Sequence, residues 1–453
     1  MLAAGCWVIA GLEDRSLGDA DAGPDGSGAQ DALAEANVDA ECAAEGSNGK
    51  VCGETGTRKC FDKVCGGNEI VSFSVFRFAC AVVRSGGVYC WGLNNAGQVG
   101  VPVDNQPHPV PTRVGGVSDA VEVSVGTSFA CARRLAGGVS CWGLNDLGQL
   151  GHPPEDDLTS GCGPSCNHVA VPVANLPPVK QITAGTLHVC ALDVSNNVWC
   201  WGSNGQYQLG DVTQDPKGGY APIKVSLGGG AAAIQSLGMA FDHTCAVARN
   251  GSPVYCWGGN ANGQMAGACD ASACYPVLVD TGVGVIVSQI VAGVGSTCLL
   301  TQQGEVKCLG NSPPNGQPAD TTAFTKVELP DVARGLAGRS SNVCAIVGAA
   351  GELYCWGNNG FLNQGIRDAG SCADASSTEC PVPQRVEGID NVVRVESQTI
   401  TAALKKDGTL WVWGNNGSGS LGHLPFAADS GDVQCVGLTI ACNTTPAPMP
   451  GLP

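Results

Sequence analysis

The sequence predicts an all-β fold, a seven-bladed β-propeller with four-stranded antiparallel blades. One phrase recurs about every 50 residues, a period typical of stacked or radially arranged units. In outline it reads Cys-Ala, then Gly, then Cys-Trp-Gly-x-Asn and Gly-Gln-x-Gly. Period-two alternation and 66 glycines exclude a helical solenoid. The seven copies are Cys80–Gly100, Cys131–Gly151, Cys190–Gly210, Cys245–Gly267, Cys298–Gln317, Cys344–Gly365 and Ala402–Gly422.

Each copy predicts a β-hairpin followed by a tight turn. In the first copy, Phe78–Val83 is apolar and β-branched, and Val88–Trp91 returns after the glycine-containing turn Arg84–Gly87. Segments between copies, such as Pro222–Val225 and Ala233–Leu237, add two short strands per unit. Four strands in each of seven repeats indicate a propeller.

The end of the chain suggests how the ring closes. Residues 446–453 resemble residues 171–177, the segment that precedes the next hairpin inside the repeats. We therefore expect residues 446–453 to complete the blade that begins near residue 69. Closure of this kind would remove an exposed sheet edge.

Cysteine spacing predicts one disulfide in each of six hairpins. The chain has 25 cysteines, and the seventh repeat has Ala402 and Val412 at both equivalent positions, as expected if the two cysteines are bonded partners. Two-cysteine sites dispersed around a ring do not supply four zinc ligands. The predicted pairs are Cys80 with Cys90, Cys131 with Cys141, Cys190 with Cys200, Cys245 with Cys256, Cys298 with Cys308, and Cys344 with Cys355.

Further cysteines are expected to constrain loops. Four close pairs follow the Gly-Gln-x-Gly turns: Cys162 with Cys166, Cys269 with Cys274, Cys372 with Cys380, and Cys435 with Cys442. Two more disulfides are expected within 42–68, a small Cys-rich module, and their connectivity stays open: Cys42, Cys52, Cys60 and Cys65. This arithmetic leaves Cys6 without a partner.

The amino-terminal residues resemble part of an export signal. Leu2–Cys6 resembles the end of a bacterial lipoprotein signal peptide, which makes 1–12 a truncated signal region and Cys6 a lipidation site. The alternative is a free thiol in a frayed tail. Residues 13–41 carry nine acidic residues and one arginine, and they are expected to form a disordered tether before the propeller at 69–453.

Disulfide density places the mature chain in an oxidising compartment. We expect a bacterial outer-membrane or cell-surface lipoprotein, or a periplasmic or secreted protein. The formal charge of −17 argues against nucleic acid or an anionic membrane as partner. A membrane contact is expected only through a lipid anchor, and the chain is expected to be a monomer.

The repeat phrase resembles the regulator of chromosome condensation repeat family, over roughly residues 69–453. The clearest copy runs from His188-Val189-Cys190-Ala191-Leu192 to Trp199-Cys200-Trp201-Gly202-Ser203-Asn204. The resemblance implies a seven-bladed propeller, and family members include a nucleotide exchange factor for a small nuclear GTPase and a secreted β-lactamase inhibitor. This chain departs from nuclear members in its disulfides and acidity. Leu309 also replaces the tryptophan of repeat five, so that blade is expected to be the least regular.

No catalytic, cofactor or metal motif stands out. There is no Gly-x-Ser-x-Gly, His-Glu-x-x-His or phosphate-binding loop. His188 and His243 recur at one repeat position, which favours a structural role. Glu155–Asp157 could hold calcium weakly, although a solvated turn is the stronger interpretation. We expect no cofactor.

One variable position offers a candidate binding surface. The residue before the second cysteine of each hairpin is aromatic in five repeats: Tyr89, Trp199, Tyr255, Tyr354 and Trp411. Strand alternation directs it away from the cysteine. If exposed, these rings would suit recognition; packing between blades is the alternative.

The sequence therefore predicts a non-enzymatic binding protein that recognises a protein or glycan. The second interpretation is an exported hydrolase or lyase with its site at the central tunnel. The third, favoured least, is a guanyl-nucleotide exchange factor.

Overall fold

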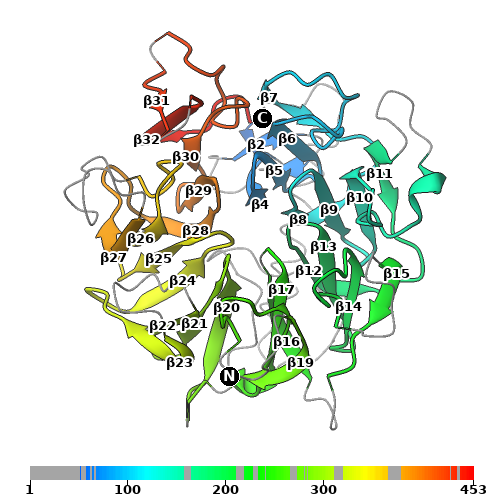
Figure 1. The fold of residues 1–453 in the computed structure, drawn as a ribbon. Coiled ribbons are helices and arrows are strands. Elements are labelled where there is room, and N and C mark those ends of the chain that lie inside the picture. The colour runs from blue at the N-terminus through cyan, green and yellow to red at the C-terminus, as the bar shows by residue number, and fades with distance from the viewer. Residues whose placement is uncertain are drawn as a thin grey trace, which may run out of the picture.

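The structure is a computed structural model. It describes residues 51–452 apart from 53–57, 62–63, 66–67, 158–164, 211–218, 228–232, 240, 266–272, 280, 283, 311–319, 366–378, 429 and 436–438. Seven sheets stand around one axis, with the first strand of each blade lining the channel and the fourth at the rim (Figure 1). The predicted seven-bladed propeller with four-stranded antiparallel blades is confirmed.

Each blade takes four strands in chain order from axis to rim. Blade one consists of β4 (Ile70–Val75), β5 (Phe78–Val83), β6 (Val88–Gly92) and β7 (His108–Arg113), and blade two of β8 (Ala120–Val125), β9 (Phe129–Arg134), β10 (Val139–Leu144) and β11 (Cys166–Pro172). Blade three consists of β12 (Val179–Ala184), β13 (His188–Asp193), β14 (Val198–Gly202) and β15 (Gly219–Lys224), and blade four of β16 (Ile234–Met239), β17 (His243–Ala248), β18 (Val254–Gly259) and β19 (Ala273–Val279). Blade five consists of β20 (Val287–Ala292), β21 (Ser296–Thr301), β22 (Val306–Gly310) and β23 (Asp320–Val327), and blade six of β24 (Ala333–Ala337), β25 (Asn342–Val347), β26 (Glu352–Asn358) and β27 (Glu379–Arg385). Blade seven consists of β28 (Val392–Ser397), β29 (Ile400–Lys405), β30 (Leu410–Asn415) and β32 (Ala441–Pro448), and a short extra strand, β31 (Val433–Gln434), pairs with the outer side of β32.

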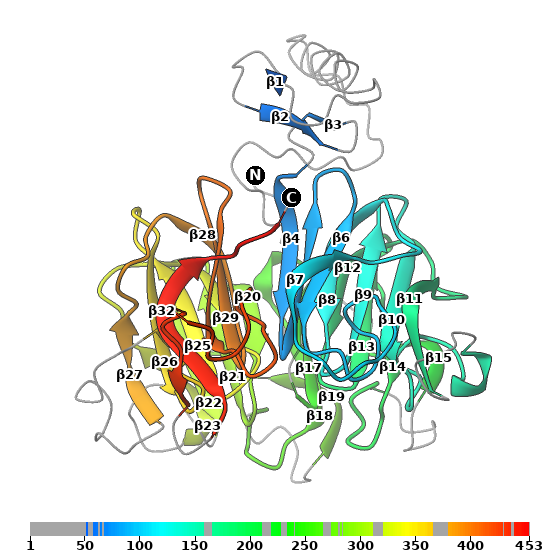
Figure 2. The ribbon, with the colours of Figure 1, turned by 90° about the horizontal axis from the view of Figure 1, so that it is seen from above.

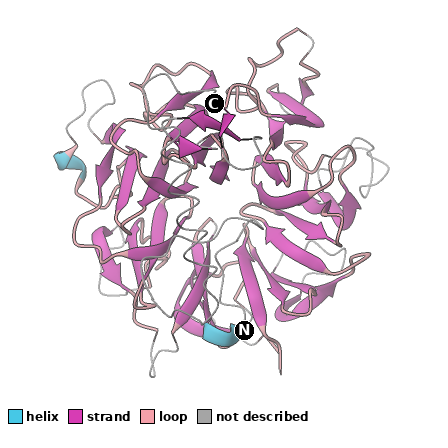
Figure 3. Cartoon of the chain, turned by 180° about the vertical axis from the view of Figure 1, so that it is seen from behind, coloured by secondary structure: helices cyan, strands magenta, loops and turns pink. Residues whose placement is uncertain are grey.

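Little else in the described part of the chain is regular. Three short strands before the ring form a separate sheet: β1 (Val51–Cys52), β2 (Arg58–Phe61) and β3 (Val64–Cys65). Two single turns of 3-10 helix, η1 (Pro154–Asp156) and η2 (Arg249–Gly251), are the cyan pieces in Figure 3.

The two ends of the ring carry different connections. The end that we call the loop end bears the links from first to second strand and from third to fourth strand of every blade. The opposite end, the hairpin end, bears the tight turns between second and third strands and the links to the next blade. The strands run between these two ends in Figure 2.

The second and third strands of each blade form the predicted hairpin, and all six predicted hairpin disulfides are confirmed. The two cysteines lie directly opposite each other in register, and their Cα atoms are 4.0 to 4.1 Å apart. In blade seven, Ala402 lies directly opposite Val412, so the same register is kept without a disulfide. The bonded pairs are Cys80 with Cys90, Cys131 with Cys141, Cys190 with Cys200, Cys245 with Cys256, Cys298 with Cys308, and Cys344 with Cys355.

The loop disulfides are described in part. Cys435 and Cys442 are bonded, with their Cα atoms 5.2 Å apart. Cys166 and Cys380 are also disulfide-bonded. The other predicted partners lie outside the described residues or side chains: Cys6, Cys42, Cys52, Cys60, Cys65, Cys162, Cys269, Cys274 and Cys372.

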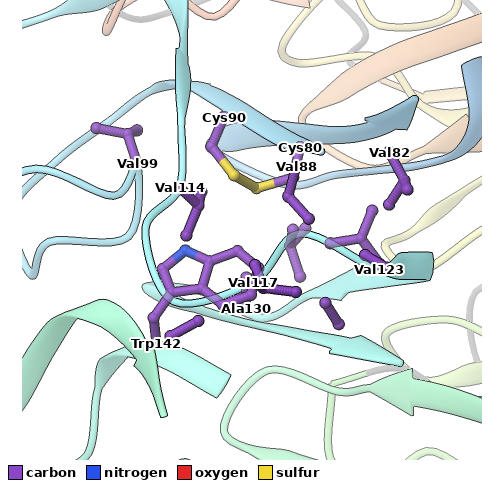
Figure 4. Close-up of a cluster of buried hydrophobic side chains, with 14 of the residues drawn as sticks. Cys80, Val82, Val88, Cys90, Val99, Val114, Val117, Val123, Ala130 and Trp142 are labelled. Atoms are coloured by element: carbon purple, nitrogen blue, oxygen red, sulfur yellow. A yellow bond between two sulfur atoms is a disulfide. The ribbon is translucent and has the colours of Figure 1, made fainter. Parts of the chain in front are cut away.

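The hydrophobic core lies between neighbouring blades. Figure 4 shows the Cys80–Cys90 disulfide beside the ring of Trp142, with Val88 in the same cluster. Trp142 is fully buried, and its Nε1 donates to the backbone oxygen of Gln98 in the preceding blade at 2.9 Å. Trp91, Trp201 and Trp257 make the same bond to Ser420, Gln149 and Gln208. The Cys-Trp-Gly and Gly-Gln-x-Gly parts of the repeat therefore fit together across each of these blade boundaries.

The ring closes differently from the sequence prediction. Residues 446–448 lie on β32, which pairs with β30 of the same blade, and β4 to β7 complete blade one by themselves. The prediction that residues 446–453 complete blade one is therefore wrong. The likeness to residues 171–177 holds, because Val171 and Pro172 also lie on the fourth strand of their own blade. Closure comes from side chains instead: Met449 and Trp91 share one core cluster, and Trp91 reaches the backbone of Ser420.

Candidate functional site

The loop end rests on turns made by buried asparagine and glutamine side chains. In blade one the Asn94 Oδ1 accepts from the Val99 N–H at 3.3 Å, and the Gln98 Oε1 accepts from the Ala96 N–H at 2.8 Å. The same pattern recurs with Asn145 and Gln149, and with Asn204 and Gln208. The repeat phrase therefore builds a fixed base in these three blades, from which loops of different sequence extend.

In blade two a buried carboxylate fixes the loop that follows this turn. The side chain of Asp157 is 1% exposed. Its Oδ1 accepts from His152 Nε2 at 2.8 Å and from Asn167, and its Oδ2 accepts from Asn145 Nδ2 at 3.1 Å. The hydrogen bond to Asp157 raises the pKa of His152 above its usual value, although burial acts in the opposite direction.

Blade seven repeats this arrangement in a looser form. The corresponding residues are Asn416, His423, Asp432 and Asn443, and Asn443 occupies the register position of Asn167. The Asp432 Oδ2 accepts from Asn416 Nδ2 at 2.9 Å, but His423 Nδ1 lies 3.7 Å away. In blade one, Asp104 pairs with His108 at 2.9 Å, and this hydrogen bond lowers the pKa of Asp104.

The carboxylates at the two ends of the ring have different partners. At the loop end, every ion pair between described residues joins an aspartate to a histidine: Asp104–His108, Asp157–His152, Asp242–His243 and Asp432–His423. At the hairpin end, the partner is arginine or lysine: Arg84–Glu69, Arg133–Glu122, Arg134–Asp119, Lys326–Glu328, Arg385–Glu352, Arg385–Glu387 and Lys405–Asp390. Histidine, unlike arginine and lysine, is not a permanent cation near neutral pH.

Permanent cations follow the same division. The described lysine and arginine side chains of the ring lie at or near the hairpin end, except Arg77 at the loop end and Arg339 and Arg394 in the channel. Asp146, Glu155 and Asp156 add exposed carboxylates to the loop end. The described loop end therefore carries carboxylates whose ion-pair partners are histidines, while the hairpin end carries carboxylates together with permanent cations.

Exposed apolar side chains lie at both ends, but the exposed phenylalanines lie at the loop end. Phe241, in the link between β16 and β17, is 48% exposed, and Phe426, in the loop after β30, is 50% exposed. Leu424 is exposed beside Phe426. The hairpin end has aliphatic counterparts of similar exposure, Leu135 and Val332.

The channel holds an arginine instead of a cluster of free carboxylates. Arg339 extends from the link between β24 and β25, and its guanidinium donates to side chains of three other blades, Ser74 at 3.3 Å, Ser124 at 3.0 Å and Thr183 at 3.3 Å. A small cavity at this place is lined by Phe76, Val125, Ala184, Gly185, Thr186, Arg339 and Gln398. Burial lowers the pKa of Arg339 from its usual value, and Glu396 acts against this shift. Arg339 therefore links the blades across the channel.

The structure does not gather the aromatic residues proposed from the sequence into one surface. They lie on the third strands of five different blades; Tyr255 is buried, and Tyr89, Trp199, Tyr354 and Trp411 are half-buried. Alanine lies directly opposite each of them on the second strand. Trp199 Nε1 donates to Asp193 at 2.9 Å, and Lys405 lies over the ring of Trp411 at 4.9 Å. No described contact joins one of these aromatic residues to another.

His188 and His243 have packing roles in the structure. Both are fully buried, and each Nε2 meets a threonine hydroxyl of the next blade, Thr244 at 3.1 Å and Thr297 at 3.0 Å. Burial lowers the pKa of His188 to about 3, so it is neutral inside the ring.

The division of counter-ions was not foreseen from the sequence. A signal for it exists: lysines and arginines flank the hairpin tips, whereas His, Asp and Asn recur after the turns at residues 148–151 of repeat two and 419–422 of repeat seven. Sequence spacing alone did not show that these turns share one end of the ring. Among the described residues, no three His, Cys, Asp or Glu side chains gather as metal ligands. None of the described helices has the length and apolar character needed to cross a membrane.

Comparisons with known proteins agree with the repeat pattern. A model of the regulator of chromosome condensation (RCC1) repeat matches residues 85–133 and 136–192, and a second model of this repeat matches 71–98, 179–208 and 237–264. The chain is 28% identical over 353 residues to the ultraviolet-B receptor UVR8 of Arabidopsis thaliana, covering 75% of each protein. It is 28% identical over 187 residues to the probable E3 ubiquitin-protein ligase HERC3 of Homo sapiens, covering 41% of this chain but 17% of that protein.

Solved structures share the architecture. Prp20p of Saccharomyces cerevisiae has a TM-score of 0.64 at 18% identity, covering 81% of this chain and 86% of Prp20p. Human WBSCR16 has a TM-score of 0.62 at 19% identity, covering 73% of this chain and 84% of WBSCR16. At these identities the likeness shows the fold alone. The chain is thus a seven-bladed propeller in which RCC1 repeats are recognised within residues 71–264, a fold that supports a binding scaffold.

Proposed function

We propose that this chain is a non-enzymatic binding protein that recognises another protein with the loop end of its ring. The observation that carries the proposal is the division of counter-ions between the two ends. Carboxylates without a permanent cation produce a negative potential at neutral pH, and such a surface attracts a partner with a basic surface. Phe241 and Phe426 are exposed on the same end and could supply apolar anchors.

The relatives support binding as the activity of the fold. UVR8 is named a receptor, and the structure of Prp20p was described together with its binding to Gsp1p and histones. These activities belong to those proteins. For this chain they favour a protein ligand over a glycan, which is the alternative ligand.

We place the protein outside the cytosol. The hairpin disulfides and the Cys435–Cys442 disulfide support an oxidising compartment. In this proposal Cys6 carries a lipid anchor, and residues 13–41 separate it from a monomeric propeller at a bacterial cell surface or in the periplasm. The relatives named above come from a plant, yeast and human, so the bacterial assignment depends on the resemblance of Leu2–Cys6 to a lipoprotein signal.

The two other functions have less support. A tunnel hydrolase or lyase would need carboxyl groups of shifted pKa beside the channel. Among the described carboxyls, hydrogen bonds lower the pKa of three that lie away from the channel, Asp104, Asp193 and Asp407. An exchange factor for a GTPase needs the cytosol, which disfavours disulfides.

Site-specific photo-crosslinking tests the proposal. A photoreactive phenylalanine analogue is placed at Phe241 or Phe426 on the loop end, and at Leu135 or Val332 on the hairpin end. These positions form matched controls because their exposures are 48%, 50%, 50% and 48%, respectively. After irradiation on intact native cells, we expect a covalent adduct with one protein from the loop-end positions alone. Equal adducts from both ends, or none from the loop end, would contradict the proposal.

A further inference from the structure

The loop end contains two equivalent loops that differ in the contacts of their buried aspartate. In the loop between β10 and β11, His152 Nε2 lies 2.8 Å from Asp157 Oδ1, whereas His423 Nδ1 lies 3.7 Å from Asp432 in the loop after β30. The two aspartate side chains are 1% and 0% exposed. Asp432 Oδ1 is buried without a hydrogen-bond partner among the described residues, but both oxygens of Asp157 are bonded. In blade seven, His423 Nδ1 instead meets Asn416 Nδ2 at 2.9 Å. The chain thus carries this network once with and once without a short contact between histidine and aspartate.

The surroundings of His152 are acidic. Asp157 and Asp156 are the charged groups that face His152, and the backbone of Leu150 also bonds to it. No described lysine or arginine lies within ion-pair distance of Asp157. A proton on His152 is therefore the positive charge available to the buried Asp157.

We propose that His152 and Asp157 form a pH-sensitive latch that holds residues 152–157, the described segment between these two side chains. The latch closes when His152 carries its proton, because the contact then becomes a charge-assisted hydrogen bond to a buried carboxylate. It loosens when the proton leaves, because the buried Asp157 keeps its charge without a cation.

The direction with pH follows from linkage. A histidine that gains a carboxylate partner on folding stabilises the folded protein. This contribution is fully present below the usual histidine pKa of about 6.5, and it is lost as pH rises through the pKa of the histidine in the folded protein. The loop is therefore best ordered in mild acid. Protonation also adds one positive charge to the loop end, so a basic partner would be held less strongly there. This second consequence rests on the proposed function; the latch itself does not.

The test uses the free, full chain. The imidazole of His152 is titrated by NMR, and amide exchange of residues 150–157 is compared at about pH 8 and about pH 5.5 after correction for chemical rates. We expect a midpoint above that of histidine in an unfolded peptide, and at least about threefold slower exchange in acid. His152→Gln keeps a neutral donor, and it should abolish the pH response of this loop.

The loop of blade seven serves as the matched control. Residues 423–432 should respond less than residues 150–157, and His423→Gln should leave the response of the blade-two loop unchanged. A midpoint at or below the peptide value, or an unchanged response in His152→Gln, would overturn the latch. Because no partner is present, a failed crosslinking experiment leaves this result standing, and a failed titration leaves the proposed function standing.

Discussion

The loop end and the hairpin end are built from the same seven repeats, yet they differ in how their charges are balanced. At the hairpin end, Arg84 meets Glu69 at 2.9 Å and Arg134 meets Asp119 at 2.7 Å. At the loop end, Asp157 meets a histidine. The comparison teaches that the repeat fixes the framework of both ends, while the loops between repeats determine at which end the carboxylates lack an arginine or lysine partner.

The framework beneath the loop end should show the largest effect. Trp201→Ala is expected to lower the free energy of unfolding by about 3–5 kcal/mol, because it empties a fully buried site and removes the bond to Gln149. Trp199, two residues earlier on the same strand, is half-buried, and Trp199→Ala should cost about 1–2 kcal/mol. Denaturant unfolding followed by circular dichroism measures both. Equal losses of unfolding free energy in the two variants would contradict the view that Trp201 belongs to the buried framework and Trp199 to its periphery.

The hairpin disulfides should come next. Replacing Cys190 and Cys200 with alanine is expected to cost about 2–3 kcal/mol, because the bond closes a short loop in the unfolded chain. The seventh blade gives the reverse experiment: Ala402→Cys with Val412→Cys introduces cysteines at the same register and should raise the unfolding midpoint under oxidising conditions. An unfolding midpoint no higher than that of the parent chain under the same oxidising conditions would contradict the expectation.

A buried histidine should respond to pH in the opposite direction from His152. Burial depresses the pKa of His188 to about 3, so the unfolded chain binds its proton first as pH falls below about 6.5. Stability should then fall by at most about 1.4 kcal/mol per pH unit from this residue. His188→Asn copies the residue that blade six has at this position, Asn342. The variant should lose less stability in acid than the parent chain. If the unfolding free energy of both proteins fell equally with decreasing pH, the depressed pKa of His188 would be refuted.

Charged side chains at the surfaces should have the smallest effect on stability. Arg134→Ala breaks a partly exposed ion pair and should cost no more than about 1 kcal/mol. Glu155→Lys at the loop end should change stability by less than about 0.5 kcal/mol, because Glu155 is exposed and unpaired among the described ion pairs. Thermal unfolding checks both, and a larger loss from Glu155→Lys would mean that this charge belongs to the framework.

Much of the framework could be predicted from the sequence, because it depends on spacing that recurs. A sequence separation of 10 or 11 places the two cysteines opposite each other in a hairpin, and six disulfides follow. Ring closure was predicted wrongly because a proline-containing segment between repeats can join either neighbouring hairpin; pairing of Ala447 with Val412 settles it. The charge division could not be derived, because it depends on which loops share an end. The aromatic residues that precede the second cysteine of each hairpin, such as Tyr89, could be identified from the sequence. Because this position occurs once in each repeat, each of these residues lies in a different blade.

The central claim is that the loop end, and not the hairpin end, is the binding surface. Once a protein is recovered by crosslinking, its affinity is measured for the parent chain, for Phe241→Ser with Phe426→Ser, and for Leu135→Ser with Val332→Ser. The account predicts a loss of at least about tenfold for the loop-end pair and less than about twofold for the hairpin-end pair. Equal losses, or a larger loss at the hairpin end, would contradict it.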